Sequence, residues 1–179
     1  LEDYTKIRAE TDSEALKLRY SNRKTYQKNS PKTSVAKSLY HLTEKIRYEK
    51  IGSDNLKGIK QNLLKNYEIR QKYKRKDQLN TKEDVSAKEA FELYLLKHFH
   101  NVELTKLSKE ILGFWEKIFD KKLNNKIDFF KQNIRDQKIF NSNFSKIIES
   151  MDIGENSEEN DQENESETNN NENQNDNKN

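Results

Sequence analysis

Residues 33–52, TSVAKSLYHLTEKIRYEKIG, contain the pattern that decides the fold class. Val35, Leu39, Leu42 and Ile46 recur there at spacings of four, three and four, which places them on one face of an α-helix. Gly52 stands where a C-terminal cap would belong, so we expect the helix to end there. This stretch predicts an amphipathic helix that packs its apolar face against a core.

Similar apolar stripes recur along the rest of the chain, which has only one proline and four glycines and no strand-like alternation longer than four residues. The polar stretch 21–33, which contains Pro31, is expected to be a loop, and Ser86 to Glu89 has the form of a capping box. The pattern predicts one all-α domain of five or six helices. The stripes lie within Ile7 to Tyr20; at Leu56, Ile59, Leu63 and Tyr67; at Phe91, Leu95 and Phe99; at Leu104, Leu107, Ile111, Trp115 and Ile118; at Ile127, Phe130 and Ile134; and at Phe140, Phe144, Ile147 and Met151.

The composition changes abruptly at residue 154. Residues 154–179 hold nine acidic residues, one lysine and no apolar residue, so their net charge is −8. Residues 1–153 hold 33 basic and 22 acidic residues, which leaves them at +11. A segment without apolar side chains cannot offset the entropy of ordering by burial. We therefore expect a helical domain over 1–153, followed by a disordered acidic tail or linker over 154–179.

Several functional classes lack support in the sequence. There is no cysteine, no apolar run near the roughly 20 residues of a membrane span, and no glycine-rich phosphate loop. No strained turn that would hold a nucleophile is indicated. His98 and His100 are two residues apart and would point away from each other on a helix, and His41 stands alone, so no metal site is predicted. We expect a cytoplasmic protein without a catalytic centre, a bound cofactor or a metal of its own.

One basic stretch leaves nucleic-acid binding open as an alternative. Residues 70–76, RQKYKRK, combine positive charge with Tyr73, and Tyr67 lies just upstream. Basic residues with stackable aromatic rings suit a phosphate backbone and unpaired bases. Dispersed acidic residues and the acidic tail would compete for such a surface, so a solvated helix end or a basic surface for an acidic partner is the favoured interpretation.

Four stretches taken together, in this order, resemble the CobT subunit of the aerobic, ATP-dependent cobaltochelatase of cobalamin biosynthesis. The positions that carry the resemblance are expected to serve structure or partner contact, and Glu44 and Arg47, three apart on a helix, can form an ion pair. The stretches are residues 7–18; residues 43–52 followed by Gly58 and Asn62; residues 114–122; and residues 136–140, which lead to residues 150–154 and the acidic tract. The positions are Glu44, Arg47, Glu49, Gly52, Gly58, Asn62, Trp115, Asp136 and Gln137.

The resemblance implies a role and a set of partners. In that family a von Willebrand factor A-type domain with a metal site follows the acidic linker, and no residue of this sequence is assigned to it. The implied partners are an AAA+ ATPase subunit and a large subunit that binds cobalt and hydrogenobyrinic acid a,c-diamide. ATP, Mg²⁺ and cobalt would be handled by those partners, and this chain would be a non-catalytic adaptor. An adaptor of the same family that serves another metallation task is a further alternative.

Overall fold

The computed structural model describes residues 2–72, 85–151 and 153, and these residues form helices and connecting turns with no strand among them. The all-α prediction is confirmed. The predicted tail, residues 154–179, lies outside the described residues. In chain order the elements are α1 (Glu2–Tyr20), α2 (Arg23–Lys28), α3 (Ser34–Asn55), α4 (Lys57–Lys72), α5 (Ala87–Leu95) continued by a π-helix (Leu96–His100), α6 (Lys106–Gly113), α7 (Glu116–Leu123), a 3₁₀-helix (Asn124–Lys126), α8 (Ile127–Gln132) and α9 (Gln137–Glu149).

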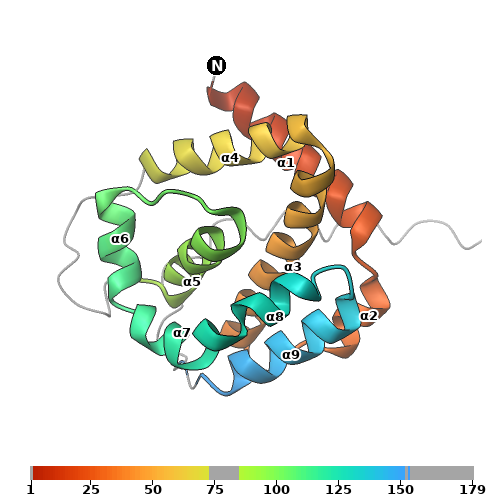
Figure 1. Cartoon of the computed structure of the whole chain (residues 1–179), viewed down its shortest axis with the longest axis vertical. Coiled ribbons are helices and arrows are strands. Elements are labelled where there is room, and N and C mark those ends of the chain that lie inside the picture. The colour runs from red at the N-terminus through yellow and green to blue at the C-terminus, as the bar shows by residue number, and fades with distance from the viewer. Residues whose placement is uncertain (1, 73–84, 152, 154–179) are drawn as a thin grey trace, which may run out of the picture.

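Helix α3 is the central element of the domain. It contacts α1, α4, α5, the π-helix and α9, and Figure 1 shows α1 and α4 around one end of α3 and α8, α9 and α2 around the other. The predicted stripe of α3 is buried, from Val35 to Ile46. Fourteen of its 22 residues are buried in all, so the burial extends well beyond one face. Polar residues of α3 are therefore enclosed together with the apolar ones.

The end of α3 differs from the prediction. Gly52 is not a cap, because the helix continues to Asn55 and the backbone N–H of Leu56 donates to the Gly52 carbonyl over 2.8 Å. The side chain of Leu16 from α1 lies directly against Gly52, where any Cβ atom would overlap it. The glycine thus allows two helices to approach closely, which its sequence position alone did not reveal.

Two further local predictions need correction. The expected loop 21–33 contains the short helix α2, because the side chain of Asn22 accepts a hydrogen bond from the Thr25 amide over 3.0 Å and caps it. The expected capping box is incomplete, since Ser86 occupies the N-cap of α5 but its side chain makes no capping hydrogen bond.

The predicted helical stripe from Leu104 to Ile118 is interrupted. Thr105 caps α6, and the chain turns at residues 114–115 before α7 begins. The turn shifts the register, so Leu112 and Phe119 become fully buried while Leu107 and Ile118 are only partly buried. The helices are accordingly shorter than the apolar pattern suggested.

The burial predicted for Trp115 is confirmed. Its side chain is 5% exposed, its ring stacks on Phe119 with centroids 6.2 Å apart, and its indole Nε1 donates to the Val85 carbonyl over 3.1 Å. A second aromatic cluster, formed by Phe99, Phe130, Phe140 and Phe144, joins the π-helix, α8 and α9. In the part of the chain that the structure describes, no helix is long and apolar enough to cross a membrane.

Candidate functional site

Glu44 and Arg47, one turn apart on α3, form a buried ion pair. The Arg47 guanidinium donates to both carboxylate oxygens of Glu44 over 2.9 Å, and the two side chains are 4% and 1% exposed. Arg47 also donates to the backbone carbonyls of Tyr20 and Ile134. The predicted pairing is confirmed, but the pair is buried rather than exposed on a solvated helix surface. The pair ties α3 to the end of α1 and to the segment before α9.

Gln137, a second predicted position, meets this pair from α9. Its Nε2 donates to Oε1 of Glu44 over 2.9 Å, and its Oε1 accepts from the backbone amide of Asn22 over 2.8 Å. Ser21 completes the group, since its hydroxyl donates to the same Glu44 oxygen over 2.6 Å. Residues at the end of α1 and at the start of α9, far apart in the sequence, thus converge on the Glu44–Arg47 pair of α3.

Glu49, two residues beyond Arg47 on α3, organises a second cluster. Its Oε1 accepts a hydrogen bond of 2.6 Å from the Ser13 hydroxyl of α1, and its Oε2 accepts one from the Tyr67 hydroxyl of α4. Burial raises the pKa of Glu49, opposed by nearby Lys45 and by the two hydrogen bonds. Burial and the adjacent Glu49 carboxylate also raise the pKa of the Tyr67 phenol. This carboxylate joins three helices at one point.

The remaining contacts between α1, α3 and α4 continue the same arrangement. Asn62 of α4 donates to Asp12 of α1 over 2.7 Å, and Leu16 of α1 packs on Gly52 of α3. The first and second stretches that carry the family resemblance therefore lie against each other in three dimensions. Their polar and small residues act as helix-to-helix contacts.

Three predicted positions lie outside these clusters. Gly58 is exposed in the first turn of α4 and has no neighbouring atom within 4 Å of the position of an added Cβ. Asp136 caps α9, with its carboxylate accepting from the Ile139 amide over 3.0 Å. Trp115 belongs to the core around Phe119. The structure therefore brings together Glu44, Arg47 and Gln137, and separately Glu49, Gly52 and Asn62, and does not join the two groups to Gly58, Asp136 or Trp115.

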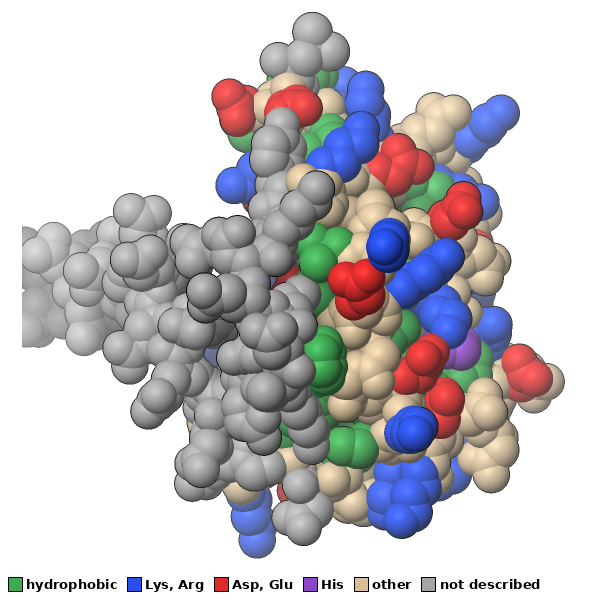
Figure 2. Space-filling view, turned by 90° about the vertical axis from the view of Figure 1, so that its left-hand side faces the viewer, with side chains coloured by type: hydrophobic (Ala, Val, Ile, Leu, Met, Phe, Trp, Pro, Cys, Tyr) green, Lys and Arg blue, Asp and Glu red, His purple; other side chains and the backbone are tan. Residues whose placement is uncertain are grey.

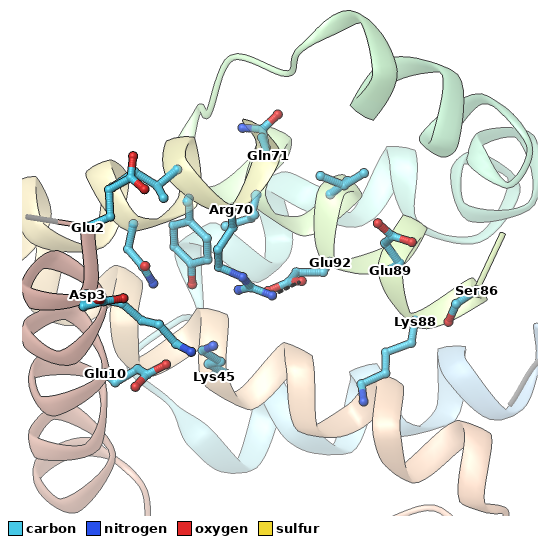
Figure 3. A pocket seen from close by; sticks show the side chains of 16 residues that line it. Glu2, Asp3, Glu10, Lys45, Arg70, Gln71, Ser86, Lys88, Glu89 and Glu92 are labelled. Carbon is cyan, nitrogen blue, oxygen red and sulfur yellow. Dashed lines mark hydrogen bonds and ion pairs between the residues drawn. The ribbon is translucent and has the colours of Figure 1, made fainter. Parts of the chain in front are cut away.

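A cavity of about 940 Å³ opens between α1, α3, α4 and α5. Figure 3 shows Arg70 and Glu92 facing each other in it, joined by two N–O contacts of 2.9 and 3.1 Å. Glu92 raises the pKa of Arg70. Glu10, Lys45 and other charged residues of both signs line the walls, so the cavity offers donors and acceptors without a dominant charge.

Two of the three histidines, His98 and His100, are largely enclosed. His98 is partly buried and His100 is 8% exposed at the end of the π-helix, and the Nε2 atom of each is buried without a hydrogen-bond partner. Burial lowers the pKa of His100 to about 4 and also lowers that of His98. Within residues 2–72, 85–151 and 153, no group of three or more His, Cys, Asp or Glu side chains could hold a metal ion.

The basic stretch 70–76 is described only at its start. Arg70 is engaged by Glu92, and Tyr67 is 3% exposed with its hydroxyl bonded to Glu49. The Tyr67 ring is therefore not presented for stacking on a base, whereas the Arg70 side chain is 48% exposed although it is paired with Glu92. Residues 73–76, including Tyr73, lie outside the described residues.

Several partners in these clusters were not singled out from the sequence. Ser13 and Asp12 of α1 and Ser21 and Asn22 beyond its end bond to predicted residues. For Ser13 a signal exists, because the small residues Thr5, Ala9 and Ser13 recur every four positions on the buried side of α1. Small side chains at that spacing indicate a close helix approach.

The family model described as cobalamin biosynthesis protein CobT matches residues 2–179 of the chain. No curated protein and no solved structure matches it. The match includes α1, α3, α4 and α9, whose motif residues form the two buried clusters.

Proposed function

Because the chain belongs to the CobT family of cobalamin biosynthesis proteins, we propose that it is a non-catalytic subunit of the aerobic, ATP-dependent cobaltochelatase. In this role it connects an AAA+ ATPase subunit to the large subunit that holds Co²⁺ and hydrogenobyrinic acid a,c-diamide. The partners bind ATP, Mg²⁺, cobalt and the corrin, and the assembly works in the cytoplasm. The family match across residues 2–179 is the observation that carries the proposal.

The geometry of the two clusters supports an adaptor role, because it makes the domain rigid. All four carboxylate oxygens of Glu44 and Glu49 accept hydrogen bonds, and four of the six bonds come from residues outside α3. Satisfied buried polar networks make a packing arrangement rigid and specific. A domain tied in this way moves as one body when a partner pushes on it, which is what transmission of an ATP-driven movement requires.

The proposal is tested by mixing the purified chain with an AAA+ cobaltochelatase subunit and measuring mass by light scattering at low and high ionic strength. Because residues 1–153 carry a net charge of +11, we expect a complex that weakens as salt rises. A complex absent at every salt concentration, with and without nucleotide, would overturn the proposal.

A further inference from the structure

Helix α1 exposes three large apolar side chains on the side that faces away from the domain. Its inner side contacts α3 and α4 through buried residues that include Ala9 and Leu16. Among the exposed large hydrophobic residues of the described chain, Tyr4, Ile7 and Leu18 lie on α1, at 65%, 61% and 86% exposure. Figure 1 shows α1 along the outer edge of the domain, where these side chains are open to contact.

The exposed apolar residues of α1 form one continuous stripe. Their spacings of three, four, four and three place them on a single face of the helix. We define the outer stripe as the five exposed residues Tyr4, Ile7, Thr11, Ala15 and Leu18. At its centre the Thr11 hydroxyl donates to the Ile7 carbonyl over 2.8 Å, so this group keeps a hydrogen bond when water is removed from the stripe.

Other parts of the described surface differ from the outer stripe. On the face that Figure 2 shows, acidic and basic side chains lie next to one another. The remaining exposed large hydrophobic residues are Leu56 after α3, Phe129 on α8 and Ile139 on α9, at 44%, 41% and 38% exposure. An apolar patch with a polar rim is typical of a protein–protein contact. The outer stripe is therefore the surface that most clearly indicates a partner.

We propose that the outer stripe binds the outer stripe of a second copy of this chain, with the two α1 helices antiparallel. A two-fold interface requires a patch that is complementary to itself. Reversal of the stripe about Thr11 places Tyr4 against Leu18 of the second copy, and Ile7 against its Ala15. The small side chains of Thr11 and Ala15 allow the two helix axes to approach to about 8–10 Å.

The charges beside the outer stripe fit this arrangement. A two-fold axis between antiparallel helices brings the same edge of each helix together. On one edge, exposed Asp3 lies near the start of α1 and exposed Lys17 near its end, so Asp3 of each copy faces Lys17 of the other. Glu10, midway along this edge, faces its own copy at the solvent-exposed rim, where water and salt screen the repulsion.

The interface is small, so the dimer should be weak. The exposed parts of the large side chains and their neighbours give on the order of 500 Å² per copy, or about 1,000 Å² in total, at the lower end for a specific contact. We expect a dissociation constant of about 10–100 µM. The inference concerns the chain alone and does not depend on the proposed cobaltochelatase partners.

Sedimentation equilibrium of the full chain tests the proposal. Between about 5 and 500 µM, the average mass should rise from the 21.4 kDa of one chain towards twice that value. Ile7→Gln combined with Leu18→Gln should raise the dissociation constant at least about tenfold. The matched control, Leu56→Gln with Ile139→Gln, changes two exposed hydrophobic residues outside the stripe and should leave the constant within about twofold. A mass that stays at one chain, or equal effects of the two variants, would overturn the proposal.

Single cysteines test the orientation, because the sequence contains none. Thr11→Cys, at the two-fold axis, should form a disulfide between copies under mild oxidation, which needs Cα atoms within about 7 Å. In an equimolar mixture of Tyr4→Cys and Leu18→Cys, mass spectrometry of the linked peptides should find bonds between positions 4 and 18 at least about threefold more often than bonds between two positions 18. A preference for the bond between two positions 18 would show parallel helices and would refute the proposed arrangement.

Discussion

Gln137 donates a hydrogen bond of 2.9 Å to Glu44, although 93 residues separate them in the sequence. The same Glu44 oxygen also accepts from Arg47 and from Ser21. A single carboxylate thereby joins α3, the end of α1 and the start of α9. Glu44, Arg47 and Gln137 thus act as internal contacts that set the relative positions of these helices.

Removal of one member of the buried ion pair should therefore destabilise the domain strongly. We expect Glu44→Ala to lower the free energy of unfolding by about 3–5 kcal/mol, because Arg47 would keep a buried charge without its carboxylate. The control is Glu14→Ala, which removes an exposed pair with Lys17 and should cost at most about 0.5 kcal/mol. Urea unfolding followed by circular dichroism measures both. Equal effects of the two substitutions would show that the buried pair has no special structural role.

The two glycines of the second motif stretch should respond in opposite ways to the same substitution. At Gly52 an added methyl group overlaps the side chain of Leu16, whereas at Gly58 it meets nothing within 4 Å. We expect Gly52→Ala to destabilise the domain by about 1–3 kcal/mol and Gly58→Ala to be neutral or to stabilise it by up to about 1 kcal/mol. Melting temperatures of the two variants provide the measurement. A Gly52→Ala protein as stable as the wild type would contradict the close approach of α1 and α3.

His100 should make the domain sensitive to acid. Its pKa is lowered from 6.5 to about 4 by burial and by Lys50 and Lys60, against a backbone hydrogen bond with Ile46 and the nearby Asp54. The stabilising contribution of neutral His100 is complete above pH 6.5 and is lost as the pH falls from 6.5 towards 4. The loss amounts to about 3 kcal/mol over that range.

The raised pKa of Glu49 acts in the opposite direction, since protonated Glu49 stabilises the domain at low pH and that contribution falls as the pH rises through its raised pKa. Comparison of wild type with His100→Phe at each pH cancels this background. The variant should show a shallower loss of unfolding free energy between pH 6.5 and 4, whereas His41→Asn at an exposed position should follow the wild type. Parallel curves for all three proteins would exclude His100 as the acid-sensitive group.

The fluorescence of Trp115 should report an enclosed environment, and its side chain should contribute strongly to the stability of the core. We expect a blue-shifted native emission maximum, because the indole is 5% exposed and stacked on Phe119. Trp115→Ala should cost about 3–5 kcal/mol. Trp115→Phe should cost less, since it keeps a ring beside Phe119 but leaves the Val85 carbonyl without its donor. An emission maximum typical of water-exposed indole would contradict this packing.

The sequence predicted the helical class and most of the core, because the apolar spacing of 3.6 residues directly reports which side of a helix is buried. Val35 to Ile46, Phe130 and Phe140 to Met151 are buried as predicted. The helix ends were predicted less well. At Gly52 the helix continues because α1 approaches there, and at residues 114–115 a turn divides the predicted stripe into α6 and α7. Both outcomes depend on tertiary contacts that no local pattern encodes.

The sequence identified the candidate positions as those that carry the family resemblance, but it did not reveal their structural roles. The spacing of Glu44 and Arg47 indicated an ion pair, yet only the fold shows that Gln137 and Ser21 surround it. Ser13 and Tyr67 bind Glu49 from two different helices, although 54 residues separate them in the sequence. Contacts of this kind arise from the arrangement of the helices, so residue type and local spacing do not reveal them.

The central claim is that this chain is part of the cobaltochelatase, and cobalt insertion tests it most directly. The AAA+ subunit and the large corrin-binding subunit are combined with hydrogenobyrinic acid a,c-diamide, Co²⁺ and ATP, and insertion is followed by the change in corrin absorbance. We predict that insertion requires the protein that contains this chain, and that the Glu44→Ala variant fails to support it at temperatures at which that variant is unfolded. Insertion at the same rate with and without this protein would contradict the account.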